Sequence, residues 1–248
     1  MAKEAGLSDQ LFVDGVDLSG DVGSVQRIGA PSGTLDTTAI NKSAHERIYG
    51  QFDGEIAFNA FFNDATAQEH ATLKAKGSGA DRILSYFHGS GIGEMAAGLV
   101  AKQMNYDPTR AADGALTIDA QTLGNGSGLD YGEQLTAGKR TDTAATNGTA
   151  LDNTATPGAT AFGLAAYLHI FSFTGTSITV TIQESSDDAA GDPYAAVTGG
   201  AFAAASAVGA QRIVTSLTQS VERYLRVVTT GTFNPCTFAV SACRYPVN

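Results

Sequence analysis

The chain has 248 residues, of which 43% are hydrophobic and 16% are charged, against roughly 25% charged residues in an average soluble domain. This length accommodates one large domain or two ordinary ones, and either buries a sufficient core without metals or crosslinks. The formal net charge of −10 argues against non-specific capture of nucleic-acid phosphates, and the low charge content indicates a surface that is largely covered by partners.

The negative charge is concentrated in the first part of the chain. Residues 1–135 hold 18 Asp and Glu against 9 Lys and Arg, whereas residues 136–248 hold 7 against 6. Beyond residue 123 the composition changes to Gly, Thr, Asn, Asp and Ala, which is typical of a linker region. We therefore expect two domains, residues 1–138 and residues 139–248. The first ten residues are short of basic and apolar residues, so the sequence predicts no signal peptide.

The N-terminal part begins with strand patterns. Residues 11–18 predict a β-hairpin around Asp14-Gly15, and a second Asp-Gly pair, Asp53-Gly54, predicts a hairpin between residues 48–52 and 55–62. In the returning strand, alternate residues are apolar, which predicts one buried and one exposed face. The polar, threonine-rich segment 34–44 predicts a loop that is long enough to do more than connect two strands.

One short helix is expected after these strands. Thr66 and Glu69 have the spacing of a capping box, and Gly77 suits a left-handed C-cap. Its apolar stripe is narrow, so we expect it to lie on a sheet. Further strands are predicted at residues 82–88, 94–106 and 115–123.

The C-terminal part shows the clearest alternation in the chain. Residues 167–183 predict a β-hairpin with a turn at residues 174–177, and its threonine-rich returning strand favours a half-buried sheet. Additional strands are predicted at residues 211–217, 224–229 and 238–243. The fold class that follows is mainly β (α+β): an N-terminal β-barrel or sandwich domain with one short helix, then a C-terminal β-sandwich.

Motifs for catalysis or for cofactor binding do not emerge from the sequence. It contains no serine-hydrolase elbow and no His-Glu-x-x-His, so we predict a protein that is not an enzyme and holds no cofactor or metal. His169 is interpreted as a hydrogen-bonded core or interface histidine. Cys236 and Cys243 are interpreted as buried or inert thiols. The acidic segment 184–192 resembles a calcium loop only weakly, and a solvated turn is favoured.

Several segments together resemble the tail tube (major tail) protein of long-tailed bacteriophages. They are LFVDGVDLSG at 11–20, DTTAI at 36–40, SAHERI at 43–48 and DGEIAF at 53–58, with IQESSD at 182–187, TGGAF at 198–202 and RYLRV at 223–227. The likeness covers nearly the whole chain and carries no catalytic signature.

The resemblance implies a structural virion protein that is assembled in the cytoplasm of the host bacterium. It implies sixfold rings that stack into a hollow tail, with strands from six subunits closing a wide β-barrel through which DNA passes without specific binding. The implied partners are further copies of the chain and the tape-measure, tail-terminator and tail-tip proteins, with no membrane.

Three sets of residues are expected to serve this function. The acidic candidates for the lumen, where negative charge would repel DNA, are Glu46, Glu55, Asp113 and Asp119; for each, an ordinary solvated strand residue is the favoured alternative. The candidates for a loop that reaches the adjacent ring are Thr34, Asp36, Asn41, Lys42, His45 and Arg47. The candidates for exterior loops are Asp187, Asp188, Asp192 and Tyr194.

The alternative from another class is a glycan-binding β-sandwich module on a virion or other surface assembly. Tyr and Asp loops on a sandwich suit this function. The chain has no tryptophan, so the flat aromatic platforms on which sugars stack would have to come from tyrosine alone.

Overall fold

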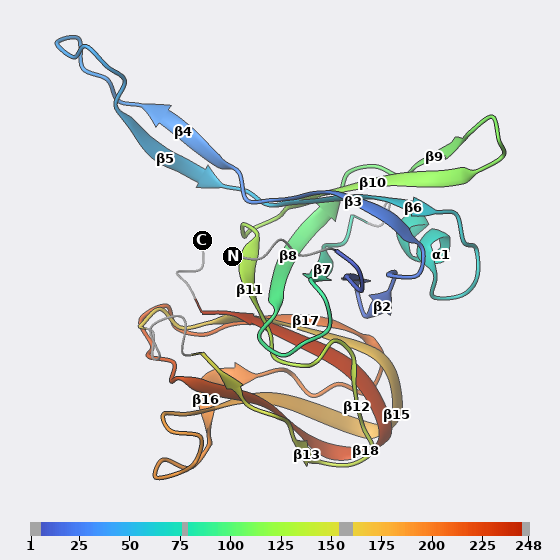
Figure 1. The fold of residues 1–248 in the computed structure, drawn as a ribbon, viewed down its shortest axis with the longest axis vertical. Coiled ribbons are helices and arrows are strands. Elements are labelled where there is room, and N and C mark those ends of the chain that lie inside the picture. Colours follow the sequence, from blue (N-terminus) through green and yellow to red (C-terminus); the bar gives the residue numbers. More distant parts are fainter. Residues whose placement is uncertain (1–5, 76–78, 154–160, 245–248) are drawn as a thin grey trace.

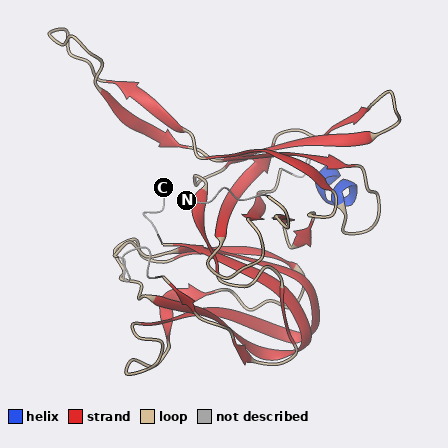
Figure 2. Cartoon of the chain, in the orientation of Figure 1, coloured by secondary structure: helices blue, strands red, loops and turns tan. Residues whose placement is uncertain are grey.

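The structure is a computed structural model that describes residues 6–75, 79–153 and 161–244. It consists almost entirely of antiparallel strands (Figure 2), which confirms the mainly β prediction. The single helix in the described ranges is α1 (Glu69–Leu73). No helix among these residues has the length and apolar character that crossing a bilayer requires.

The described residues form eighteen strands in two sheets (Figure 1), one of sixteen strands and one of two. The first eleven are β1 Gln10–Val13, β2 Val16–Asp17, β3 Val22–Gly29, β4 Ser32–Asp36, β5 Arg47–Phe52, β6 Glu55–Phe61, β7 Arg82–Phe87, β8 Met95–Gln103, β9 Asp107–Arg110, β10 Leu116–Gly124 and β11 Asp130–Gln134. The remaining seven are β12 Arg140–Asp142, β13 Thr146–Asn147, β14 Leu151–Asp152, β15 Ala165–Ser185, β16 Ala195–Ala201, β17 Gly209–Val214 and β18 Tyr224–Cys243.

The N-terminal strands form an open sheet over their own apolar core. The predicted hairpin of β1 and β2 turns at Asp14 and Gly15, which both have positive φ. In β6 the predicted alternation is confirmed: Ile56, Phe58 and Ala60 are buried in the core that also contains residues of β1, β7, β8 and α1. The described strands of this part close no barrel.

The hairpin predicted around Asp53-Gly54 is wrong, because β5 pairs with β4 and not with β6. The Asp53 N–H donates to the Pro31 carbonyl at 2.9 Å. A Cβ on Gly54 would lie 2.4 Å from Leu99 Cδ1 and 2.7 Å from the Leu129 nitrogen. The glycine is therefore required for close packing where the chain enters the body, and not for a turn.

The helix is shorter than predicted and begins differently. Its N-cap is Gln68 with no side-chain cap, and its C-cap is Lys74, so the capping box at Thr66 is wrong. Gly77 lies outside the described residues. Glu69, predicted to cap the helix, is instead buried beneath it.

The C-terminal part is a sandwich wound from two very long strands. β15 and β18 pair along nearly their whole length, bending so that both layers enclose one apolar core. The turn predicted at residues 174–177 is wrong, because β15 continues through it with register shifts around Gly175. The separate strands predicted at 224–229 and 238–243 are likewise one strand, β18. Cys236 and Cys243 are buried thiols, as predicted.

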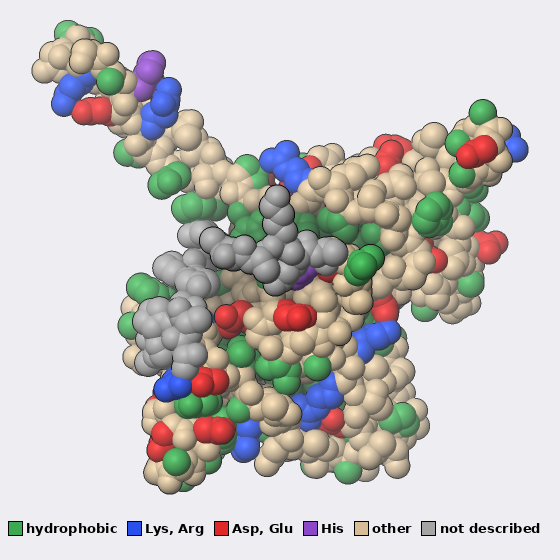
Figure 3. Space-filling view, viewed as in Figure 1, with side chains coloured by type: hydrophobic (Ala, Val, Ile, Leu, Met, Phe, Trp, Pro, Cys, Tyr) green, Lys and Arg blue, Asp and Glu red, His purple; other side chains and the backbone are tan. Residues whose placement is uncertain are grey.

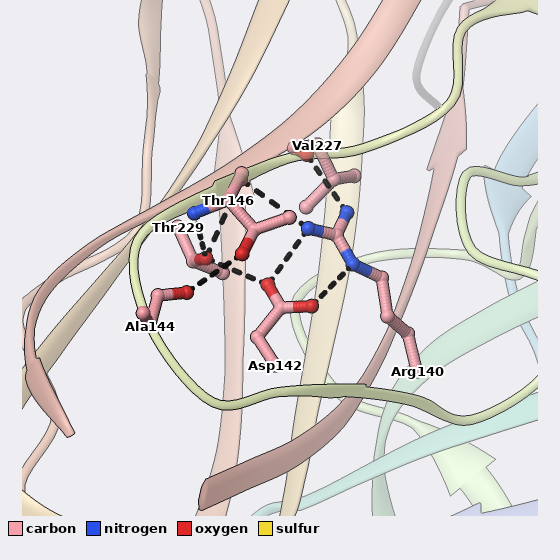
Figure 4. A network of polar contacts seen from close by, with 6 residues as sticks. All are labelled: Arg140, Asp142, Ala144, Thr146, Val227 and Thr229. Atoms are coloured by element: carbon pink, nitrogen blue, oxygen red, sulfur yellow. Dashed lines mark hydrogen bonds and ion pairs between the residues drawn. The ribbon is translucent and has the colours of Figure 1, made fainter. Parts of the chain in front are cut away.

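A polar network holds the segment after β12 against β18 (Figure 4). The Arg140 guanidinium donates to both Asp142 carboxylate oxygens, at 2.8 and 2.7 Å, and to the Val227 carbonyl at 2.9 Å. The Thr229 hydroxyl donates to Asp142 at 2.6 Å and accepts from the Thr146 N–H at 3.1 Å. Because every partner of the buried Asp142 is a donor, its charge is satisfied within the fold.

The two parts of the chain are joined through β11 and a buried histidine. β11 pairs with β8 on one side and with β18 on the other. His169 Nδ1 accepts from the Gly15 N–H at 3.2 Å, so the ring proton lies on Nε2, which donates to the Ser85 hydroxyl at 3.0 Å. The prediction that His169 is a hydrogen-bonded interface residue is confirmed.

We expect His169 to make the folded protein lose stability in acid. Burial lowers the pKa of His169 from 6.5 to about 3, so the unfolded state binds a proton that the folded state excludes. This stabilisation is complete above pH 6.5 and is lost as the pH falls from 6.5 toward 3, by at most about 1.4 kcal/mol per pH unit. Denaturant titrations at several pH values between these limits measure the slope.

A His169→Gln variant should show a shallower slope over the same range. His45→Gln is the matched control, because His45 is exposed on the molecular surface, and it should keep the wild-type slope. Equal slopes for wild type and the His169 variant would contradict the assignment.

Candidate functional site

A β-hairpin projects from the body and is called the arm here; it comprises β4, β5 and the connecting residues 37–46 (Figure 1). Within the described residues, β4 and β5 pair with each other and with no further strand. Nearly every arm residue is exposed. A two-stranded hairpin is at best marginally stable in water, so the arm lacks the packing that stabilises the rest of the fold.

The arm carries large apolar side chains on both of its faces, and Figure 3 shows hydrophobic side chains along the side of the arm that is in view. Leu35 lies directly opposite Ile48 on one face. An extra residue in β5 places Tyr49 and Phe52 on the other face, where their rings stack with centroids 6.3 Å apart. Tyr49 is 77% exposed, and Ile40 at the tip is fully exposed. Apolar side chains clustered in this way mark a surface for association.

Three of the six residues predicted to contact an adjacent ring lie on the arm in two side-chain pairs. Asp36 binds His45 Nδ1 at 2.9 Å, and Lys42 binds Glu46 at 2.9 Å. The Thr38 hydroxyl and N–H donate to Asp36, and with His45 they lower the pKa of its carboxyl. These contacts order a connection that the sequence indicated only as a polar loop. The remaining predicted residues, Thr34, Asn41 and Arg47, are exposed on the same arm.

Part of the sixteen-stranded sheet lies beside the base of the arm. In it the strand order is β3-β6-β10-β9, and the far end of β10, residues 122–124, also pairs with β8, which joins this part to the rest of the sheet. Among the described residues, β3 pairs with β6 alone and β9 pairs with β10 alone. The register of β3 shifts after Val22 and again after Val25, and such bulges increase the twist of a strand. Both outer strands present unpaired backbone donors and acceptors.

Polar side chains cover the face of this sheet that points away from the core. Asp119 accepts from the amides of Asn59 at 2.8 Å and Gln26 at 3.2 Å. Glu55 accepts from the Gln121 amide at 2.7 Å and pairs with Arg27 at 2.9 Å. The face therefore carries two carboxylates held by amides and by one arginine.

The four predicted lumen residues do not lie together. Glu55 and Asp119 share the polar face, although the side chain of Glu55 is only 11% exposed and its charge is paired. Asp113 lies in the connection between β9 and β10, where it accepts from the Ala115 N–H at 3.0 Å. Glu46 lies on the arm.

The predicted exterior loop is an ordered acidic turn after β15. Asp192 accepts from the Ser186 N–H at 2.9 Å and donates its own N–H to Asp187 at 3.0 Å, while Tyr194 donates to Asp188 at 2.7 Å. The Arg226 guanidinium lies 4.0 Å above the Tyr194 ring. In the part of the chain that the structure describes, no group of three or more Asp, Glu, His or Cys is placed to hold a metal ion.

Sequence reasoning missed the apolar residues of the arm. Residues 48–52 were expected to pair with the body, which hid the exposure of Ile48, Tyr49 and Phe52. One signal was available in the sequence. Gly50 and Gln51 can form a β-bulge, and with a bulge there residues 48–52 can pair with the polar segment 32–36 as well as with residues 55–62.

No protein-family model matches the chain, and no curated protein sequence matches it significantly. Several solved structures are similar to it. One is "Virion of native gene transfer agent (GTA) particle", at 14% identity and a TM-score of 0.43, over 52% of this chain and 98% of that chain. A second is a tail of the empty GTA particle with C6 symmetry, at 17% identity and a TM-score of 0.40, over the same shares. A third is the SPP1 Dit protein, described as a paradigm of the hub adsorption apparatus of phages that infect Gram-positive hosts, at 12% identity and a TM-score of 0.34, over 96% of this chain and 99% of that chain.

The arm should be the least protected part of the dilute protein in hydrogen exchange. Its amides are held by a single hairpin ladder, whereas β15 and β18 are paired across a buried core, so we expect arm amides to exchange within seconds and those of β18 within hours. Exchange followed by mass spectrometry of peptides measures both. Slow exchange in residues 32–52 at low concentration would show that the arm is stable by itself.

Proposed function

We propose that this protein is the tail tube protein of a long-tailed bacteriophage and polymerises as stacked hexameric rings that conduct the genome. The observation that carries the proposal is the pair of outer strands β3 and β9, each with one unpaired edge among the described residues, beside an arm that has no packing partner of its own. The residue patterns that resemble tail tube proteins support it independently. Nothing in this arrangement requires a catalytic group.

Lateral association closes the ring through the edges of the sheet. β3 and β9 lie at opposite edges of the same four strands, so β9 of one copy meets β3 of the next by a repeated rotation. A head-to-tail contact of this type generates a closed ring when the rotation closes. The pairing satisfies the backbone groups that both edges leave open, and the twist from the bulges in β3 curves the wall.

Axial association uses the arm. It extends away from the body on the side opposite the β9–β10 connection (Figure 1), and its exposed Leu35, Ile48 and Tyr49 require a surface to cover them. We assign this surface to the adjacent ring. Burying apolar area contributes about 25 cal/mol per Å², which stabilises a stack of rings without any specific charge pair.

The polar face of the sheet lines the channel in this arrangement. Of the four acidic candidates, Asp119 and Glu55 are the two assigned to the lumen. Arg27 compensates the charge of Glu55, so Asp119 supplies most of the negative field there, and six copies repel DNA phosphates. The cationic group described on this face, Arg27, is already paired with Glu55, which weakens its hold on a passing phosphate.

The remaining assignments follow from this orientation. Residues 1–138 form the ring, and residues 139–248 lie on the outside of the tail, where the turn with Asp187, Asp188, Asp192 and Tyr194 is accessible. The partners are further copies, the tape-measure, tail-terminator and tail-tip proteins, and the DNA in transit. The site of action is the virion tail, after assembly in the host cytoplasm.

Removing the arm should abolish tubes and leave the fold intact. The hydrogen bond between Asp53 N–H and the Pro31 carbonyl closes the arm at its base, so residues 32–52 can be replaced by Gly-Gly without moving the body. We expect the melting temperature to stay within about 4 °C of wild type, which corresponds to roughly 1 kcal/mol. Negative-stain microscopy should show rings without stacked tubes.

The matched control replaces residues 187–191, in the exterior turn, by Gly-Gly and should still form tubes. Tubes of normal length from the armless protein would rule out the axial role of the arm.

Paired cysteines at the two sheet edges should link neighbouring copies. Gln26→Cys in β3 with Thr109→Cys in β9 brings one thiol to each edge, and the native Cys236 and Cys243 are buried. Mild oxidation of assembled protein should give a ladder on non-reducing gels that ends at the hexamer. Each single variant should stop at the dimer or below. A double variant that stays monomeric in assembled tubes would refute pairing of β3 with β9.

A further inference from the structure

A buried carboxyl group lies where edge strand β3 begins. Glu69 on α1 is 0% exposed, and neither of its carboxylate oxygens has a hydrogen-bond partner in the described residues. Leaving an ionised carboxylate buried and unpaired is far more costly than leaving it protonated. The geometry of the group therefore favours its neutral form.

The surroundings of Glu69 act in the same direction. Asp21 approaches from the segment before β3, and its Oδ2 accepts from the Glu69 N–H at 3.2 Å, while Oδ1 accepts from the Asn63 amide at 2.9 Å. Two N–H donors thus hold Asp21 as the carboxylate of the pair. Two neighbouring buried carboxyl groups do not both lose their protons, because the two negative charges would repel each other.

Within the described residues, no cation forms an ion pair with Asp21 or Glu69. Of the other ionisable groups around α1, His70 Nδ1 is engaged by the Tyr106 hydroxyl. Arg82 donates to the Thr72 carbonyl at the end of α1 and pairs with Asp14 at 2.8 Å. Lys74, the C-cap residue, is exposed to solvent.

A second buried polar atom without a partner lies near the end of the same helix. The Gln103 amide donates to the Leu73 carbonyl at 2.9 Å, one turn along α1 from Glu69. Its own oxygen, Oε1, is buried and, in the described ranges, has no donor. The surroundings of α1 therefore supply Gln103 Oε1 as a further acceptor and no donor to stabilise an ionised Glu69.

We propose that Glu69 is a buried carboxylic acid that keeps its proton in weakly acidic solution, and that losing this proton loosens edge strand β3. The effect on β3 operates through Asp21, whose N–H donates to the Leu18 carbonyl at 2.9 Å and whose carbonyl accepts from the Phe61 N–H at 2.8 Å. Asp21 directly precedes Val22, the first residue of β3. Losing the proton places a second negative charge against the residue that positions this edge.

The direction of the pH dependence follows from the two states. The pKa of Glu69 is raised from 4.5 to about 7 by burial and by Asp21. The folded state therefore binds a proton that the unfolded state has released, and the stabilisation is complete below pH 4.5 and lost as the pH rises through 7. The effect on ring formation rests on the proposed function, whereas the effect on the single chain does not.

The first experiment measures thermal stability of the dilute full-length protein from about pH 5 to pH 9. Relative to Glu69→Gln, whose amide stays neutral, wild type should lose stability as the pH rises from 5 to about 7 and should lose no more above that pH. Asp64→Asn, an exposed carboxylate on the same connection, is the matched control and should behave as wild type. A wild-type loss that persists in Glu69→Gln would overturn the proposal.

A direct readout covers the case in which the variant is less stable. Infrared spectroscopy of wild type at pH 6 should show the band of one protonated carboxylic acid, which disappears above pH 8 and is absent in Glu69→Gln. Absence of the band in wild type would overturn the proposal. So would a shift of the alkaline transition on adding calcium or magnesium, because the site would then take a cation.

The second experiment concerns assembly. The concentration needed for rings should rise by up to about tenfold per pH unit above pH 7 in wild type, and not in Glu69→Gln. An equal rise in both proteins would overturn the effect on β3. A protein that forms no rings at any pH would refute the proposed function, while the stability and infrared measurements still decide the state of Glu69.

Discussion

The pairing of β11 with both β8 and β18 determines how every other surface of the molecule is placed. Through this strand one sheet continues from the N-terminal core into the sandwich, so the two parts have no hinge between them. A buried triad reinforces the joint: Tyr167 donates to Asp130 at 2.6 Å, and Arg212 donates to Asp130 and to the Tyr167 oxygen, each at 2.9 Å. Gly98 admits the Tyr167 ring, since a Cβ there would lie 2.3 Å from it. The arm, the open sheet and the outer turn therefore keep fixed relative directions.

Local signals predicted the elements whose partners are close in sequence. Asp14-Gly15 turns as expected, since a two-residue loop is set by its own dihedral preferences. The alternation in β6 reported its buried face correctly, because burial selects side chains directly. The turns predicted at Asp53-Gly54 and at residues 174–177 were wrong because contacts with distant residues, and not local turns, require the glycines there. Their glycines satisfy contacts with Leu99 and Phe233, which lie far away in the chain, and a single sequence shows the glycine without showing what approaches it.

The candidate surfaces were predicted less completely than the fold. The segment 34–47 stood out through its length and polarity, but its apolar counterparts in β5 were assigned to the body, because exposure is a tertiary property. Nothing in the sequence separates the lumen candidates Asp119 and Asp113. The pairing of β10 with β6, which places Asp119 opposite Asn59 on the polar face, separates them only in the structure. Glu69 carried a conventional helix-capping pattern, and its burial depends on where α1 packs, which no local motif encodes.

Because a hydrogen bond closes the base of the arm, the length of the arm can change without changing the stability of the body. Because the Asp53 N–H and the Pro31 carbonyl meet at 2.9 Å, residue pairs can be added to or removed from β4 and β5 without altering the body. Each added pair lengthens the hairpin by about 3.3 Å. In the proposed tube, small insertions in this one hairpin change the spacing between rings, while the diameter, which the proposal assigns to the sheet, stays constant.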